Sequence, residues 1–341
     1  MSPSTFPGET IEVASRFDRE AKAVLSLGDC EDVLPTLPDD FAKLIITSPP
    51  YNIGKQYEEI KDLAHYMEAF EPIIEQLVRI LSHQGSICWQ VGNYVKDSQI
   101  FPLDIYFYPI FAAHGLRLRN RIVWHFEHGL HASKRFSGRY ETILWFTKSD
   151  EYTFHLDPVR IPSKYPGKRH FRGEKQGQPS GNRLGKNPSD FWPVLRHDWE
   201  CSVWEIPNVK ASHPEKTIHP CQFPIELVER CVLALTDDDD WVVDPFAGVA
   251  TSVIAALGNN RRGMGCERDE QYVRLATGRI ADLARGVLPY RFLGKPIYRP
   301  SGREKVAKMP NEWLSDGNGE DFQRSTTDEN ANDETISVAG V

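Results

Sequence analysis

Short apolar runs rich in β-branched residues recur along the first 150 residues and alternate with longer stretches. The run at 43–47 leads directly into Ser48-Pro49-Pro50, which predicts a buried strand that ends in a rigid loop. A helical spacing of apolar residues follows from about His65 to Leu81. Further strands are predicted at 86–91, 121–124 and 142–146. Strands that alternate with helix-length stretches indicate a largely parallel sheet.

The same alternation returns after residue 224. Apolar residues at helical spacing predict a helix over 225–235, and Trp241-Val242-Val243 predicts a strand that meets Asp244-Pro245-Phe246-Ala247-Gly248. The elements expected next are a helix at 251–257, a strand at 262–266 that leads to Glu267, and a helix at 271–283. A chain of 341 residues with two such α/β parts fits one enlarged core plus a substrate module.

Between these two parts, residues 155–218 lose the regular pattern and become rich in Gly, Pro, Ser and basic residues, which predicts an irregular insertion. Residues 155–196 contain three acids and nine bases, and the bases are Arg160, Lys164, Lys168, Arg169, Arg172, Lys175, Arg183, Lys186 and Arg196. A polyanion would bind here, although a solvated basic loop without a partner is the alternative.

Overall composition is that of a soluble protein, with 40% hydrophobic and 26% charged residues. No targeting signal and no run of about 18 apolar residues occurs, so we expect a cytoplasmic protein that does not engage a membrane. The six cysteines form no Cys-x-x-Cys pair, which favours reduced thiols and argues against a metal site.

Net charge is -8, which is unexpected for a protein with a polyanionic partner. The acidic, Asn-rich tail explains it, because residues 311–341 hold eight acids against one base, Arg324. The rest of the chain is nearly neutral, and the tail is expected to be disordered.

The turn after the strand at 241–243 resembles a nucleotide-binding βαβ unit. Gly248 permits close approach of a ligand, and Glu267, 23 residues after Asp244, is placed to accept hydrogen bonds from ribose hydroxyls. Because Gly248-Val249-Ala250 offers little bare backbone for a pyrophosphate, a ligand with a ribose and no phosphate is favoured. Alternatively, Asp244 and Glu267 cap strand ends and Phe246 is a core aromatic.

The segment Thr47-Ser48-Pro49-Pro50-Tyr51-Asn52 has the chemistry to activate an aromatic amine. Its prolines fix the backbone and lack N–H donors, so their carbonyls are expected to point outward as acceptors. The Ser48 hydroxyl and the Pro49 carbonyl could hold both amino hydrogens, while Tyr51 offers a face for an unstacked base. The alternative is a plain turn or an extended Pro-Pro-Tyr ligand segment.

Thr-Ser-Pro-Pro-Tyr-Asn followed by Asp-Pro-Phe-Ala-Gly resembles the DNA amino-methyltransferases of restriction-modification systems. The catalytic loop precedes the cofactor loop, as in the permuted beta class, and the resemblance covers roughly residues 24–285. It implies a Rossmann-like, seven-stranded, mostly parallel α/β sheet, S-adenosyl-L-methionine as cofactor, double-stranded DNA as partner and a prokaryotic or phage origin. A cognate restriction endonuclease acting on the same DNA site is a further expected partner.

The resemblance also assigns roles to individual residues. It implies catalysis by Ser48, Pro49, Pro50 and Tyr51, and cofactor binding by Asp29, Pro220, Asp244, Pro245, Phe246, Gly248, Thr251 and Glu267. DNA binding is expected from Lys164, Lys168, Arg169, Arg172, Lys175, Arg183 and Lys186. Ser-Pro-Pro-Tyr is usual for cytosine and Asp-Pro-Pro-Tyr for adenine, so cytosine N4 is the expected target and adenine N6 the alternative.

Five segments follow from this assignment. Residues 1–23 form an N-terminal arm, 24–154 the catalytic half, 155–218 the target recognition insertion, 219–300 the cofactor half and 301–341 the acidic tail.

Two departures from the family pattern are Ala250, where many relatives have glycine, and Cys221 with Phe223, where Thr and Lys are commoner. Pro220-Cys221-Gln222 matches the nucleophile of cytosine ring-carbon methyltransferases, but no Glu-Asn-Val partner occurs, so Cys221 is expected to pack at a helix start. A nicotinamide-dependent oxidoreductase and a DNA-binding protein without catalysis are the remaining alternatives.

Overall fold

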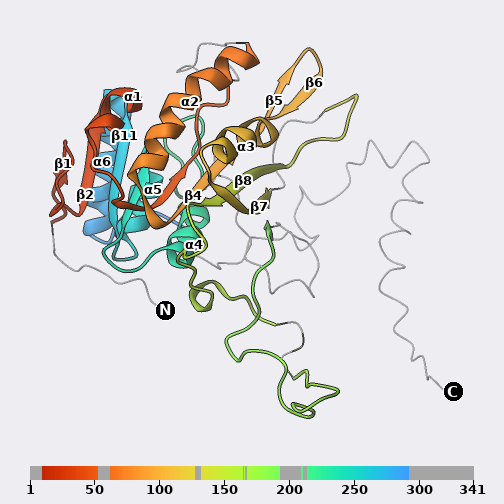
Figure 1. The fold of residues 1–341 in the computed structure, drawn as a ribbon. Coiled ribbons are helices and arrows are strands. Elements are labelled where there is room, and N and C mark those ends of the chain that lie inside the picture. Colours follow the sequence, from red (N-terminus) through yellow and green to blue (C-terminus); the bar gives the residue numbers. More distant parts are fainter. Residues whose placement is uncertain are drawn as a thin grey trace, which may run out of the picture. The chain divides into compact units, whose positions relative to one another are not determined.

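A computed structural model of the protein describes residues 10–52, 62–126, 132–163, 165, 167–192, 209 and 213–291. The main sheet has nine strands in the order β1-β2-β11-β10-β3-β4-β8-β7-β9 (Figure 1). Their bounds are β1 Val13–Ala14, β2 Ala23–Leu27, β3 Ala42–Thr47, β4 Leu81–Val91, β7 Arg117–His125, β8 Tyr140–Thr147, β9 Phe191–Trp192, β10 Trp241–Asp244 and β11 Arg262–Glu267. A separate hairpin consists of β5 Asn93–Lys96 and β6 Gln99–Pro102.

The predicted mostly parallel sheet is confirmed. Only β8 runs against its neighbours β4 and β7, and every other pair in the main sheet is parallel. Seven strands have between four and eleven residues, and the two-residue strands β1 and β9 extend the sheet at its edges. The prediction that helix-length stretches separate the strands is wrong between β7 and β8. The described residues between these strands form a loop, and the two strands pair antiparallel.

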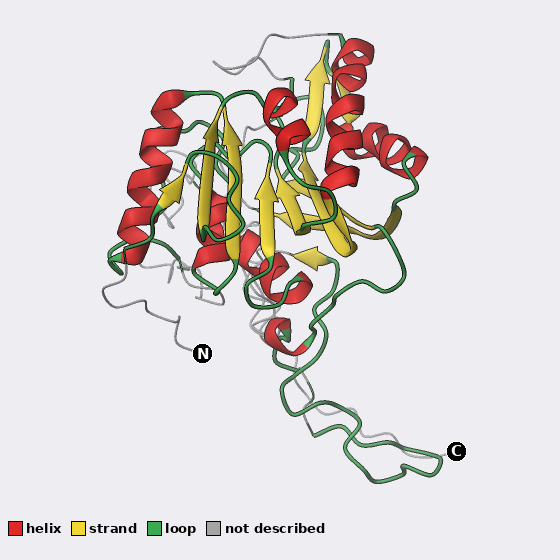
Figure 2. Cartoon of the chain, turned by 60° about the vertical axis from the view of Figure 1, so that its left-hand side comes forward, coloured by secondary structure: helices red, strands yellow, loops and turns green. Residues whose placement is uncertain are grey.

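Helices cover both faces of the sheet (Figure 2). Their bounds are α1 Cys30–Val33, α2 Leu63–Ile80, α3 Leu103–Ala113, α4 Ile225–Leu235, α5 Thr251–Leu257 and α6 Glu270–Ala284, with 3-10 turns at Leu34–Thr36 and Asp157–Val159. Residues alternate between the two faces along β3: Ile45 packs in the core formed with α2 and α3, whereas Leu44 and Ile46 pack with α4 and α5. No helix in the described ranges is long and apolar enough to cross a membrane.

The sheet changes its winding direction between β3 and β10. From β3 the chain continues outward to β4 through α2, and from β10 it continues the other way to β11 through α5. Loops at the carboxyl ends of strands that flank such a point form the usual ligand crevice of open α/β sheets. The loops after β3 and β10 are the two that the sequence singles out.

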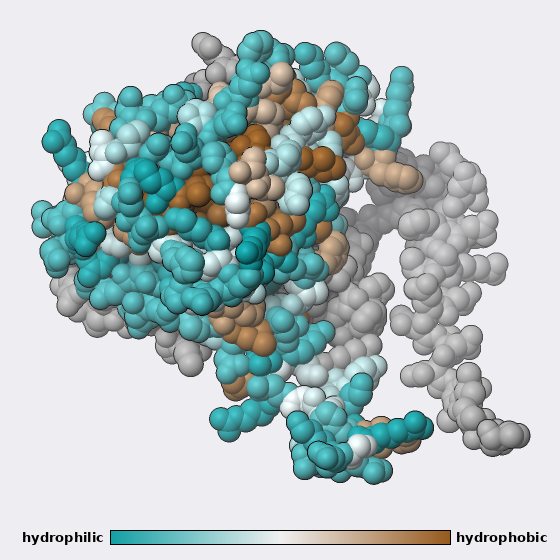
Figure 3. Space-filling view, in the orientation of Figure 1, coloured by the Kyte–Doolittle hydropathy of each residue, from teal (hydrophilic) through white to brown (hydrophobic). Residues whose placement is uncertain are grey.

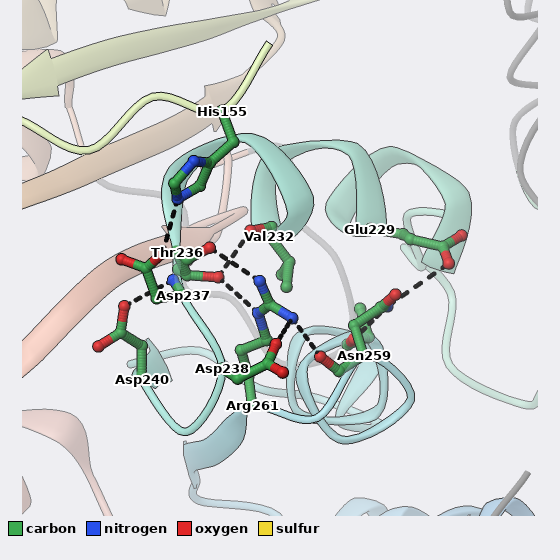
Figure 4. A network of polar contacts seen from close by, with 10 residues as sticks. His155, Glu229, Val232, Thr236, Asp237, Asp238, Asp240, Asn259 and Arg261 are labelled. Atoms are coloured by element: carbon green, nitrogen blue, oxygen red, sulfur yellow. Dashed lines mark hydrogen bonds and ion pairs between the residues drawn. The ribbon is translucent and has the colours of Figure 1, made fainter. Parts of the chain in front are cut away.

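A polar cluster lies at the amino ends of the parallel strands, where the chain turns from α4 into β10 (Figure 4). Arg261 donates to the Thr236 carbonyl at 2.8 Å and to Asp238 at 2.6 Å, and His155 contacts Asp237 at 2.7 Å. These partners satisfy the titratable groups of the turn. The cluster therefore fastens the beginning of the 155–218 segment to the sheet.

Beyond this anchor, the described residues among 161–186 form an arm that extends away from the sheet (Figure 2). Ile161 and Lys186 pair antiparallel at its base, and Arg169 and Pro179 pair closer to its tip. The arm is long, mainly hydrophilic on its surface (Figure 3), and almost free of regular structure. The arm is thus irregular, as the sequence predicts for 155–218, whereas Phe191–Trp192 of the same segment forms the edge strand β9.

Candidate active site

Loops at the carboxyl ends of four strands line one cavity of about 640 Å³, a size typical of small-molecule sites. Residues from the loops after β2, β3, β10 and β11 contribute, together with the segment before α4. The predicted site residues on the wall are Asp29, Ser48, Pro49, Pro50, Tyr51, Pro245, Phe246, Gly248, Thr251 and Glu267. Two loops separated by almost 200 residues thus share one cavity.

The turn after β10 has a left-handed backbone. Gly248 has φ 51°, and Ala250 keeps φ 61° although it carries a side chain. A Cβ at Gly248 would come to 3.0 Å from Nε2 of His219, so a side chain there would adopt an unfavourable φ and would press on the His219 ring. The Gly248 N–H donates to Oε2 of Glu267 at 2.9 Å, which ties this turn to the end of β11.

Cavity charge fits a cationic ligand that carries a ribose. The carboxylates of Asp29, Glu267 and Asp269 line the wall, and Arg268 is the single Lys or Arg among the described lining residues. Both Glu267 oxygens accept a backbone N–H, yet a carboxylate has about four acceptor sites and can also bind hydroxyls. Burial raises the pKa of Glu267. S-adenosyl-L-methionine matches these acidic acceptors, because it has a cationic sulfonium and ribose hydroxyls and lacks phosphates.

Two of the predicted cofactor residues do not line the cavity. Asp244 is 1% exposed, and its carboxylate accepts from Oγ1 of Thr47 at 2.6 Å, from the Phe246 N–H at 3.0 Å and from the Ser252 hydroxyl. Burial raises the pKa of Asp244 to about 6. Asp244 therefore braces the cofactor turn against β3 from behind. Pro220 is exposed and lies outside the lining.

The loop after β3 carries a chain of hydroxyl groups that ends at a carboxylate. Ser48 Oγ contacts Tyr51 Oη at 2.8 Å, and Tyr51 Oη contacts Oε2 of Glu141 at 3.3 Å. Gln90 also donates to this Glu141 oxygen, at 2.6 Å. Burial and the nearby Glu141 charge raise the pKa of Tyr51, so its hydroxyl stays protonated.

Sequence reasoning missed Glu141 and Gln90 as members of the site. Glu141 precedes the apolar run predicted as a strand, and Gln90 stands inside another. A polar residue at the end of a buried strand was the available signal. Tyr51 and Glu141 are 90 residues apart in sequence, so a local pattern does not reveal their contact.

The two proline carbonyls differ. Tyr66 on α2 donates its hydroxyl to the Pro50 carbonyl at 2.5 Å, so the expectation that both carbonyls are free acceptors is wrong for Pro50. Pro49 is buried and lines the cavity. Ser48 and Pro49 thus both line the cavity, whereas the Pro50 carbonyl is already bonded within the protein.

Cys221 does not pack at the start of α4, as the sequence suggested. It is exposed and lines the cavity, whereas α4 begins four residues later at Ile225. His219 lies on the same wall, and its ring packs edge-on against Tyr272 with centroids 4.6 Å apart. Burial lowers the pKa of His219 to about 4, so this imidazole is neutral beside the cofactor turn.

Six of the seven predicted DNA-binding cations lie on the described part of the arm. All of those that the structure describes are exposed: Lys168, Arg169, Arg172, Lys175, Arg183 and Lys186. Arg169 also donates to the Gly177 carbonyl across the arm at 2.5 Å. Lys164 lies outside the described residues. The arm thus presents a basic surface separate from the cavity.

Comparison with known proteins identifies the family. A family model described as DNA methylase, for N6 and N4 modification, matches residues 42–278. M.BglII of Bacillus subtilis, a type II methyltransferase, is 46% identical over 265 residues, which cover 77% of this chain and 70% of M.BglII. The DNA adenine methyltransferase YhdJ of Escherichia coli K12 is 29% identical and covers 78% and 85% of the two chains.

Solved structures of DNA methyltransferases have the same fold as this chain. A protein assigned as a DNA modification methylase in Thermus thermophilus, in complex with S-adenosyl-L-methionine, has a TM-score of 0.54 and 26% identity over 77% of this chain and 96% of its own. The cytosine-N4-specific PvuII methyltransferase shares the fold, with a TM-score of 0.56, 19% identity and coverage of 77% and 92%. The chain belongs to the S-adenosyl-L-methionine-dependent DNA amino-methyltransferases of restriction-modification type.

Proposed function

We propose that this methyltransferase modifies the N4 amine of cytosine in double-stranded DNA. The observation that supports cytosine is Ser48, which stands first in Ser-Pro-Pro-Tyr, where adenine enzymes usually have Asp, and which lines the cofactor cavity. Similarity to YhdJ, an adenine methyltransferase, favours adenine N6 as the second candidate.

The cofactor would be held by the wall of the cavity. Glu267 would accept the ribose hydroxyls, Asp29 would lie near the adenine, and the turn at 245–251 would contact the remainder. S-adenosyl-L-methionine supplies an electrophilic methyl group when bound. His219 and Tyr272 would cover the opposite side of the cofactor turn, and the neutral His219 adds no repulsion to a sulfonium.

The catalytic loop would activate the target amine by accepting its hydrogens. An aromatic amine is a poor nucleophile because its lone pair is delocalised, and acceptors at Ser48 Oγ and the Pro49 carbonyl would localise the lone pair on nitrogen. The flipped base would stack on Tyr51. The nitrogen would take the methyl group directly as the bond between this methyl and the sulfonium breaks, and the methylated amine would then lose one proton to solvent. No covalent enzyme intermediate is needed, so the thiol of Cys221 would be dispensable.

The arm would grip the DNA backbone through its exposed cations, as the target recognition part of the enzyme. Within the cell, a restriction endonuclease that cuts the same site would be the functional partner.

Nucleoside analysis by mass spectrometry tests the target base. DNA methylated by the enzyme should yield N4-methylcytosine on digestion. N6-methyladenine would instead establish the adenine alternative, and ring-carbon-methylated cytosine would contradict the mechanism.

Ser48→Ala should lower the single-turnover rate roughly 10- to 1,000-fold with cofactor affinity unchanged, because it removes a contact that strengthens in the transition state. Cys221→Ser should stay active.

A further inference from the structure

The loop between β7 and β8 exposes an aromatic ring that the methyltransferase chemistry described above does not use. Phe136 is 99% exposed, more than any other large hydrophobic side chain in the described part of the chain. Burying a phenylalanine side chain is worth roughly 1.5–3 kcal/mol, so a partner that covered this ring would gain that stabilisation on binding. No described residue covers it.

This loop starts and ends at the catalytic side of the sheet. Its base is closed by the Phe126 N–H, which donates to the Arg139 carbonyl at 2.7 Å, and its tip by the Ala132 N–H, which donates to Ser137 Oγ at 3.1 Å. Two residues after Arg139 comes Glu141, which accepts from Tyr51. Glu141 lies five positions after Phe136 in the sequence, and a chain of that length spans at most about 17 Å. Phe136 therefore lies within reach of a base pair whose target base is in the cavity.

The residues around Phe136 suit a nucleic acid. Lys134, Arg135 and Arg139 lie within three residues of the ring, and no acidic residue occurs between Ala132 and Arg139. Cations bind phosphates, and an apolar side chain between them can enter a duplex and separate base steps. The combination of an exposed ring with flanking cations favours duplex DNA as the partner that covers this loop.

We propose that Phe136 enters the DNA duplex where the target base leaves it and stacks on the neighbouring base pairs. The ring fills the gap and so stabilises the flipped state, while Lys134 and Arg135 hold adjacent phosphates. Phe136 is in this sense a positioning residue, since it acts on the target through the duplex. The inference depends on the proposed action on a flipped base in double-stranded DNA.

Single-turnover methylation of two duplexes tests this role, once sequencing of DNA from expressing cells has located the methylated site. One duplex is fully paired at that site, and the other has an abasic position opposite the target base. Phe136→Ala should slow transfer to the paired duplex about 5- to 150-fold, the range that corresponds to stacking one aromatic ring on a base. On the abasic duplex, where the target is already unpaired, the loss should shrink to about threefold or less, and Phe136→Trp should retain activity on both.

Phe171→Ala is the matched control, because Phe171 is also exposed, at 81%, but lies on the distant arm. Its effect should be the same on both duplexes. Equal losses for Phe136→Ala on the paired and abasic duplexes, or no loss on the paired one, would overturn the proposal. Wild-type enzyme that methylates only single strands would instead refute the proposed function, so the two failures are distinguishable.

Discussion

A carboxylate cannot donate a hydrogen bond, and this fixes the direction of the hydroxyl chain in the catalytic loop. Glu141 must accept from Tyr51, so Tyr51 must in turn accept from Ser48. The Ser48 hydrogen is therefore donated to Tyr51, so Ser48 Oγ, in a residue that lines the cavity, can only accept a hydrogen bond from a ligand. An acceptor is what an amine requires, because its hydrogens have to be held while its nitrogen attacks.

Tyr51→Phe tests this orientation. The variant keeps the ring on which a base would stack, but it frees the Ser48 hydroxyl to rotate and to compete as a donor. We expect single-turnover methyl transfer to fall roughly 10-fold, about 1.4 kcal/mol, which is in the range of one hydrogen bond in a network that ends at a charge. Cofactor affinity, measured by calorimetry, should not change.

Tyr66→Phe is the matched control for this experiment. It also removes a hydroxyl that contacts the loop, at the Pro50 carbonyl, but it leaves the chain from Ser48 to Glu141 intact. A rate loss in Tyr66→Phe as large as that in Tyr51→Phe would mean that general loosening of the loop, rather than orientation of Ser48, explains the effect.

His219 gives a prediction about pH. Its pKa is lowered to about 4 by burial, whereas a histidine in the unfolded chain titrates near 6.5. The unfolded state then binds more protons between these values, so the stability that His219 contributes is complete above pH 6.5 and is lost as the pH falls toward 4. The melting temperature of wild type should drop more from pH 7 to pH 5 than that of His219→Gln. An equal drop in both proteins would refute the neutral, buried state.

At the scale of elements, regular periodicity made most of the fold predictable. The helix at 251–257 agrees with the structure at both ends, and the strand at 262–266 continues by one residue to Glu267. The hairpin β5–β6 was not predicted because its turn, Asp97-Ser98, has positive φ at both residues and lacks the usual glycine. Nor was α3 predicted, since it is largely apolar and contains Pro109.

The site was predictable where its chemistry is local in sequence. The sequence pattern predicts a strand before each of three site residues, Ser48, Gly248 and Glu267. It therefore places all three at the carboxyl ends of the strands, where they line one cavity. The role of Asp244 was not predictable in this way, because its partner Thr47 is 197 residues away. Whether a strand-end carboxylate faces a ligand or a neighbouring strand depends on packing across the sheet.

The arm is the element that we expect to set affinity for DNA. Lys168, Arg172 and Lys175 should be replaced together with Ala, and Arg169 kept because it holds the arm to the Gly177 carbonyl. If all three cations neutralise phosphates, the slope of log affinity against log salt should become shallower by about 0.9 for each phosphate that is no longer neutralised. Fluorescence anisotropy of a labelled duplex at several salt concentrations measures this slope.

The control variant replaces Lys22, Lys43 and Arg285, which lie toward the amino ends of the parallel strands. It removes the same charge from outside the arm. The slope should then stay close to that of wild type. If both triple variants change the slope equally, net charge governs binding and the arm has no special role.

At the scale of the whole molecule, the protein joins two halves that are far apart in sequence into one sheet. Strand β3 leads into the proposed catalytic loop and β10 into the proposed cofactor turn, and the two strands are direct neighbours. The Thr47 hydroxyl crosses this junction to Asp244, which is fully buried with a pKa raised to about 6. One hydrogen bond thus couples the geometry of the two loops to the charge of a buried carboxylate.

Thr47→Val, which keeps the shape of the side chain and removes its hydroxyl, should therefore destabilise the protein in a pH-dependent way. Loss of a partner to a buried charge costs about 1–3 kcal/mol and raises the pKa of Asp244 further. In an acid, a folded-state pKa that is raised above the unfolded value lowers stability as the pH rises. The loss of unfolding free energy in Thr47→Val, measured with urea, should therefore be larger at pH 8 than at pH 5.5, where Asp244 is mostly protonated.

Thr142→Val is the control. Thr142 is also buried, but its hydroxyl donates to the uncharged Val91 carbonyl at 3.2 Å, so its loss of unfolding free energy should be the same at both pH values. A deficit of Thr47→Val that does not vary with pH would show that Asp244 is not the charged brace between the two halves.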